Sequence, residues 1–286
     1  MPLSTDNSAL VRLGVLEALG EVLFTFHQDE DGPPQELVQL FLGRKEDRRV
    51  RDGQQGLPEE EVAQARHREH ILNSVFGLER PASLASPQQS TRIDKGDALE
   101  SFYTDPARPL ICAFNYPAVT MTLGRARWWE LREVYLDLAE NRAVKVRRTL
   151  AASLGELAKI IGEENASRDL VGVWWDAVRC EEEEVREKVV ECIEVFVAAL
   201  GCEAREEVVR GLLTVWEEGV FRGWREREGV AKAFVGLINL VGRNNTTVLR
   251  GLLRNALEDH VAAVREAAVY AVSSPMNMNN WMRLGC

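Results

Sequence analysis

The chain has 286 residues, of which 45% are hydrophobic and 28% are charged, an ordinary composition for a folded, water-soluble protein. Its formal net charge of −10 argues against nucleic acid as a partner, because binding along a phosphate backbone requires clustered Lys and Arg. No stretch reaches the roughly 18 apolar residues that a membrane span needs, and the N-terminus lacks the basic and apolar regions of a signal peptide, so we expect no membrane partner.

Residues 1–51 contain two helical patterns. Residues 9–27 predict the second helix of a helical pair whose first helix is missing. Residues 34–43 predict the first helix of the next pair. We therefore expect this segment to hold two units of a helical array, the first of them partial.

Residues 52–108 break this pattern. Their glycines, prolines and polar stretches are typical of a long loop, and one short helix is predicted at residues 59–76. The helical pattern resumes at residues 110–124, although Pro117 is expected to kink or break that helix. Gly124 lies 38 residues before Gly162, so residues 110–124 are the second helix of the interrupted pair. We therefore expect residues 52–108 to be a largely disordered insertion within one pair.

The clearest helical pair follows. Residues 127–140 predict its first helix, and residues 144–161 predict its second helix, with Gly162 as the stop signal. The apolar side chains of the second helix recur every three or four residues, which places them on one face. They are Val146, Leu150, Leu154, Leu157 and Ile161.

This second helix recurs about every 40 residues. Residues 144–162 are echoed by residues 184–201, by residues 225–242 and, in shortened form, by residues 263–273. A recurrence near 40 residues in an apolar helical pattern is typical of HEAT and armadillo solenoids. The sequence therefore predicts an all-α fold, an α-α superhelix of the HEAT/armadillo type, with its main array at residues 109–272.

The two ends of the array lack the polar capping face of terminal repeats. Pro275 stops the last helix early, and residues 273–286 predict an irregular tail. We expect the chain to be part of a longer solenoid.

An arginine recurs with the repeat, in steps of 39, 41 and 38 residues. It is found at Arg147, Arg186, Arg227 and Arg265. Asp259 lies six residues before Arg265, at the turn between the helices, and we expect such pairs to bridge neighbouring turns as a ladder. Other turns carry Asn141, or Cys180 with Glu181, in place of the aspartate. Because a surface ion pair contributes at most about 1 kcal/mol, we interpret the ladder as setting the register of the repeats.

Catalytic and metal-binding motifs are not evident in the sequence. His67 and His70 lack the spacing of a zinc-binding helix. The acidic residues 181–184 are typical of a solvated helix N-terminus, and no paired cysteines predict zinc. The five cysteines are odd in number and widely spaced, which indicates reduced thiols and a cytoplasmic or nuclear location. We expect no enzyme activity, cofactor or metal; an active site within residues 52–108 would require activity that disappears when they are deleted.

Tryptophans are the remaining candidates for binding. Trp129 and Trp175 follow core tryptophans on the first helices of successive pairs, and an exposed tryptophan pair is a candidate protein-binding anchor.

Residues 110–162 resemble the central HEAT region of the regulatory subunit 1 family of protein phosphatase 4. The resemblance rests on the motifs CAFNYP at 112–117, TLGR at 122–125 and VKVRRTLA at 144–151. The first two are the more specific, because helices seldom need proline and glycine there. The resemblance extends more weakly over residues 10–43 and 168–242.

This resemblance implies a non-catalytic scaffold. Such a subunit binds a serine/threonine phosphatase catalytic subunit and directs it to phosphoprotein substrates or adaptors. In related scaffolds, partners dock along the turns that join the two helices of each pair. The corresponding residues here are Glu140, Asn141, Arg142, Arg179, Glu181, Glu182, Glu217, Glu218, Glu258 and Asp259. The alternative is another HEAT-repeat adaptor, such as a transport receptor or an assembly scaffold, that binds different protein clients.

Overall fold

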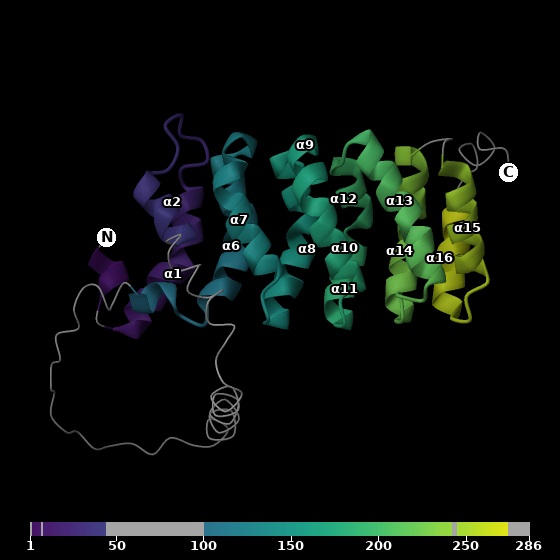
Figure 1. Cartoon of the computed structure of the whole chain (residues 1–286), viewed down its shortest axis with the longest axis horizontal. Coiled ribbons are helices and arrows are strands. Elements are labelled where there is room, and N and C mark those ends of the chain that lie inside the picture. The colour runs from purple at the N-terminus through teal and green to yellow at the C-terminus, as the bar shows by residue number, and fades with distance from the viewer. Residues whose placement is uncertain (1, 7, 44–99, 242–244, 274–286) are drawn as a thin grey trace, which may run out of the picture. The chain divides into compact units, whose positions relative to one another are not determined.

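A computed structural model of the chain describes residues 2–6, 8–43, 100–241 and 245–273 (Figure 1). Every regular element among these residues is helical, so the predicted all-α solenoid of paired helices is confirmed. None of the described helices is long and apolar enough to cross a membrane. The predicted helix at residues 59–76, His67 and His70, nearly all of the insertion and the tail beyond residue 273 lie outside the described residues.

The described residues fall into two compact units. The first comprises residues 1–16 and 38–105. It holds the 3-10 helix η1 (Pro2–Thr5), the first half of α1 (Ala9–Phe24) and most of α2 (Gln35–Leu42). Its buried side chains include Leu16, Phe41 and Phe102.

The second unit comprises residues 17–37 and 106–286 and contains the main array. Helix α6 (Arg108–Leu123) is followed by the short η3 (Arg125–Arg127) and by four helical pairs. The pairs are α7 (Trp128–Ala139) with α8 (Val144–Ile161); α9 (Glu163–Asn165), η4 (Ala166–Leu170) and α10 (Val171–Arg179) with α11 (Glu183–Glu191) and α12 (Ile193–Ala199); α13 (Cys202–Glu217) with α14 (Trp224–Val241); and α15 (Thr246–Leu257) with α16 (Ala262–Ser273).

The second helices of these pairs form a continuous layer. Helix α6 packs on α8, α8 packs on α11 and α12, these pack on α14, and α14 packs on α16 (Figure 1). The predicted apolar face of α8 lies in this core, where Val146, Leu150, Leu154, Leu157 and Ile161 are all buried. Its spacing therefore locates the core of the array correctly.

Two local features of the structure differ from the sequence pattern. Pro117 is expected to kink or break its helix, and the break does not occur, since α6 runs through Pro117 from Arg108 to Leu123. A proline removes only one backbone donor, and the fully buried Tyr116, whose hydroxyl donates to the carbonyl of Leu131, fixes the helix at this point.

The second difference lies at residues 184–201, where the repeat predicts a single second helix. The structure divides it at Cys192 into α11 and α12. The division lies at a close approach to α8, because a Cβ atom added to Gly155 would stand 3.2 Å from the Cβ atom of Cys192. Contact with the preceding pair therefore overrides the local helical pattern.

Candidate protein-interaction surface

The recurring arginines close the turns of their own helical pairs. Each donates from Nη1 to the backbone carbonyl six residues earlier, near the C-terminal end of the first helix, where carbonyls lack helical partners. The acceptors are Asn141 for Arg147 at 2.6 Å, Cys180 for Arg186 at 2.7 Å, Phe221 for Arg227 at 3.0 Å and Asp259 for Arg265 at 2.7 Å. Each arginine therefore holds its own turn in a fixed shape.

Three of these arginines also reach an acid of the next pair. Arg147 pairs with Glu182, Arg186 pairs with Glu226 at 2.8 Å, and Arg227 pairs with Asp259 at 2.6 Å. The three acids lie four, one and six residues before the next ladder arginine, so they share no position in the repeat. The pairs link successive turns into one ridge.

Glu226 is the ladder residue that the sequence pattern conceals. It stands where other repeats carry valine before the arginine. In the structure its side chain is 0% exposed and that of Arg186 is 5% exposed, so the two form a buried ion pair. A carboxylate in a valine position was the sequence signal for this pair.

The ladder carboxyls differ in their pKa values. The hydrogen bond from Arg147 lowers the pKa of Glu182 below its ordinary value. Burial acts to raise the pKa of Asp259, but hydrogen bonds from Arg227 and from the N–H of Val261 outweigh burial and lower it. Burial dominates at Glu226 and raises its pKa despite Arg186.

Sequence reasoning missed one further arginine of this type and one buried arginine at the same repeat step. Arg108 begins α6 one 39-residue step before Arg147 and is 5% exposed, but the predicted insertion included it. The step itself was the signal that identifies it. In the first unit, Arg12 donates to the carbonyl of Asp6, again six residues earlier, at 2.7 Å.

Of the predicted docking residues at the turns, four have hydrogen-bond or ion-pair partners and six are exposed charges. Glu182 and Asp259 are ladder acids. The side chain of Asn141 accepts the N–H of Ala143, and Glu181 lies 3.6 Å from Arg222. Exposed charges occupy the other positions: Glu140, Arg142, Arg179, Glu217, Glu218 and Glu258.

The two candidate tryptophans have different environments. Trp129 on α7 is 73% exposed. Trp175 is half-buried, and the guanidinium of Arg179 stacks 4.9 Å from the centre of its ring. The expected exposed tryptophan pair is therefore reduced to Trp129 alone.

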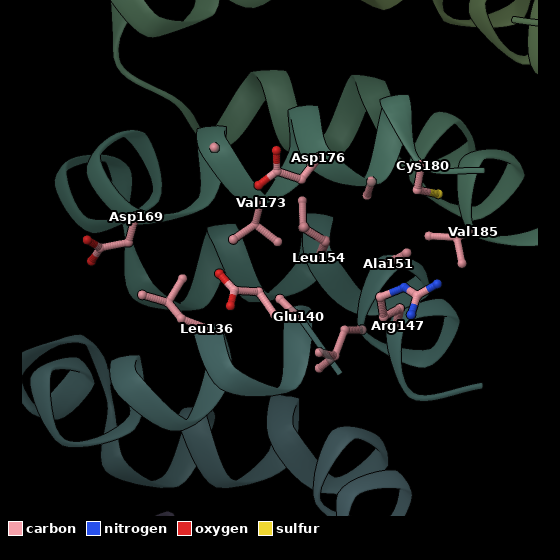
Figure 2. Close-up of a pocket in the computed structure, with 14 residues that line it drawn as sticks. Leu136, Glu140, Arg147, Ala151, Leu154, Asp169, Val173, Asp176, Cys180 and Val185 are labelled. Atoms are coloured by element: carbon pink, nitrogen blue, oxygen red, sulfur yellow. The ribbon is translucent and has the colours of Figure 1, made fainter. Parts of the chain in front are cut away.

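A groove of about 380 Å³ lies between α7 and α10, above α8 (Figure 2). At one end Asp169, from the π-helical segment η4, accepts hydrogen bonds from Trp128 Nε1 at 2.8 Å and from Arg132 Nε at 2.7 Å. Burial acts to raise the pKa of Asp169, but its hydrogen bonds to Arg168, Trp128 and Arg132 lower it overall. Arg147 lies at the other end of the groove (Figure 2).

No group of three His, Cys, Asp or Glu side chains that could hold a metal ion occurs in the part of the chain that the structure describes. Burial raises the pKa of the Cys192 thiol to about 12, which keeps this thiol protonated and unreactive. The described surface presents an apolar groove and exposed charges to which a partner can bind.

Known proteins are similar in sequence to this array. Residues 112–215 match the family model for the protein phosphatase 4 regulatory subunit 1 middle domain. The human serine/threonine-protein phosphatase 4 regulatory subunit 1 is 34% identical over 220 residues, which cover 71% of this chain and 23% of that protein. The mouse and rat proteins of the same name are 34% identical over 179 residues, or 59% of this chain and 19% of theirs.

The chain thus spans less than a quarter of the length of the curated relatives that it matches. These relatives are named as regulatory subunits and not as catalytic enzymes. The matched residues include the central helices α7 to α12 and the ladder residues Arg147, Glu182 and Arg186. The chain is therefore similar to regulatory subunit 1 of protein phosphatase 4, and its residues 112–215 match the middle domain of that family.

Proposed function

We propose that this chain is a non-catalytic scaffold that binds the catalytic subunit of a serine/threonine protein phosphatase and directs it to phosphoprotein substrates or adaptors. Its similarity to proteins named as phosphatase 4 regulatory subunits supports this function. A cytoplasmic or nuclear location belongs to the same proposal and rests on the cysteine pattern of the sequence.

The observation that carries the proposed docking mode is the continuous ridge of turns. The ladder pairs hold neighbouring turns together, so the exposed charges of successive turns are kept in fixed register. Arg142 and Arg179 supply positive charge, whereas the later turns carry Glu217, Glu218 and Glu258. Charges fixed in this way favour one orientation of a partner with the complementary charge pattern.

A pull-down with purified phosphatase 4 catalytic subunit tests this docking mode. The double variant Arg142→Glu/Arg179→Glu is expected to weaken binding about tenfold, because it reverses two exposed positive charges of the ridge. The control variant Arg210→Glu/Lys159→Glu makes the same change of charge at exposed positions on helices α13 and α8. It is expected to bind like the wild type.

The outcomes separate the docking mode from the function. Unchanged binding of the ridge variant removes Arg142 and Arg179 from the interface. Affinity purification from the native cell tests the function itself. Recovery of transport or assembly clients without a phosphatase catalytic subunit would contradict the phosphatase role.

A further inference from the structure

The first helices of three successive pairs carry a glycine at the same repeat position. Gly172 on α10, Gly211 on α13 and Gly251 on α15 are separated by steps of 39 and 40 residues. At two of them a large apolar side chain from the preceding first helix lies on the glycine. A Cβ atom added to Gly211 would stand 2.3 Å from the Trp175 ring, and one added to Gly251 would stand 2.9 Å from Leu213.

Gly172 differs from its two counterparts because no side chain of the described residues covers it. A Cβ atom added there would meet no heavy atom of the described residues within 4 Å, apart from its chain neighbours and the backbone of its own helix. Leu136 on α7 precedes Gly172 by 36 residues, as Trp175 precedes Gly211. Leu136 lines the groove without reaching Gly172. The groove therefore occupies the place that Trp175 fills one repeat later.

The lining of the groove is chemically matched to such a side chain. Leu150, Ala151 and Leu154 of α8 line its floor, and Val173 and Ala177 of α10 line one wall. Burying a large apolar side chain against this lining removes apolar surface from water, which is the main source of affinity in such grooves.

The charges at the groove favour particular residues beside that side chain in a bound peptide. Asp169 and Arg147, at the two ends, are held in ion pairs with Arg132 and Glu182. Glu140, which follows α7, and Asp176 on α10 are exposed on opposite sides of the opening (Figure 2). No described residue forms an ion pair with either of these two carboxylates. The opening therefore presents negative charge from both walls.

We propose that this groove binds a short peptide segment of another protein, in which a large apolar side chain lies on Gly172 and neighbouring Lys or Arg residues face Glu140 and Asp176. The apolar side chain of the partner covers Gly172, as Trp175 covers Gly211. The groove adjoins the ridge of turns at Glu140 and Arg147, so it adds an apolar contact for a client protein to the charged contacts of the ridge.

Calorimetric titration of the whole chain with three capped tripeptides tests the chemistry of the site. Acetyl-Arg-Trp-Arg-amide is expected to bind about tenfold tighter than acetyl-Arg-Ala-Arg-amide, which lacks the apolar side chain, and tighter than acetyl-Glu-Trp-Glu-amide, which reverses the charges. Equal affinity of the first two peptides, or of the first and third, would overturn the proposal.

Two matched glycine substitutions locate the binding. Gly172→Leu fills the groove and is expected to weaken binding of acetyl-Arg-Trp-Arg-amide about tenfold. Gly14→Leu is the control, because Gly14 is another helical glycine with no described heavy atom within 4 Å by the same measure. Both substitutions favour the helix, since glycine is a poor helix former. Equal binding by these two variants would exclude the groove as the site.

A charge variant keeps the test independent of any change in folding caused by Gly172→Leu. Glu140→Lys/Asp176→Lys changes two exposed side chains and is expected to reverse the preference, so that acetyl-Glu-Trp-Glu-amide becomes the tighter ligand. An unchanged preference for the arginine peptide would contradict the assignment of these two carboxylates.

Discussion

At the scale of single residues, the ladder pairs differ in burial and therefore in energetic consequence. Arg186 and Glu226 are enclosed, whereas Arg148 and Glu184 form an exposed pair at 3.5 Å. An exposed pair contributes at most about 1 kcal/mol to stability. A buried pair costs desolvation when it forms, but removal of one partner leaves an uncompensated charge in the interior.

Arg186→Met is accordingly expected to lower the free energy of unfolding by about 3–5 kcal/mol, because it leaves Glu226 buried without its partner. Arg148→Met, the control at the exposed pair, is expected to lower it by less than about 1 kcal/mol. Urea unfolding followed by circular dichroism measures both. The double variant Arg186→Met/Glu226→Leu should recover most of the loss, and equal effects of the two single variants would show that burial does not govern the ladder.

The carboxyls also predict how stability depends on pH. Asp169, Asp259 and Glu182 have folded pKa values below their ordinary values. Each therefore contributes stability above its unfolded pKa of about 4, and this contribution is lost as the pH falls through the folded pKa. Glu226 has a raised folded pKa and the opposite sign, so its contribution is present at low pH and is lost as the pH rises through that value.

With Glu130, whose hydrogen bond from Arg127 also lowers its pKa, four described carboxyls have lowered pKa values and one has a raised value, so the free energy of unfolding should fall between about pH 5 and pH 3. Asp259→Asn should make this decline shallower, since it removes one of the groups that must take up a proton. Urea unfolding at a series of pH values measures the decline. A decline as steep in Asp259→Asn as in the wild type would contradict the role given to Asp259.

At the scale of helices, glycines at the same repeat position lie in two different packing environments. Gly211 is required because Trp175 lies on it, whereas Gly172 meets open space. Gly172→Ala should therefore raise the free energy of unfolding by up to about 1 kcal/mol through helix propensity. Gly211→Ala should lower it by about 1–3 kcal/mol, because the methyl group displaces the Trp175 ring. Thermal unfolding compares the two, and changes of the same sign would contradict these packing environments.

The helical pattern predicts the helices better than it predicts their contacts. The apolar spacing of α8 identifies its buried face, and Gly162 ends the helix with a φ of 80°, as its position suggested. The division at Cys192 and the continuity through Pro117 depend on packing against neighbouring helices, which the local sequence does not contain.

The candidate sites are still harder to predict for the same reason. The recurring arginines were visible as a period, but their acids lie at three different positions in the repeat, and Glu226 resembled a substitution for valine. The groove exists because Leu136 on α7 does not reach Gly172 on α10. This distance between two helices cannot be read from the sequence of either helix alone.

At the scale of the main array, each ladder pair joins two successive repeats, and repeat proteins gain stability from such contacts between neighbours. The turns of the array are thereby fixed relative to one another before any partner arrives. A partner that docks on them loses little freedom to ordering, which favours affinity. This is the physical basis of the proposed scaffold.

Amide hydrogen exchange of the chain, with and without phosphatase 4 catalytic subunit, tests this central claim most directly. Binding along the ridge should slow exchange in the turns at residues 140–143, 180–182, 218–223 and 258–261. The connections at the opposite ends of the helices, Gly162 and residues 200–201, should exchange at unchanged rates. Slowed exchange at those opposite connections, with the turns unaffected, would contradict the ridge as the docking surface, and unchanged exchange throughout would contradict binding of the catalytic subunit.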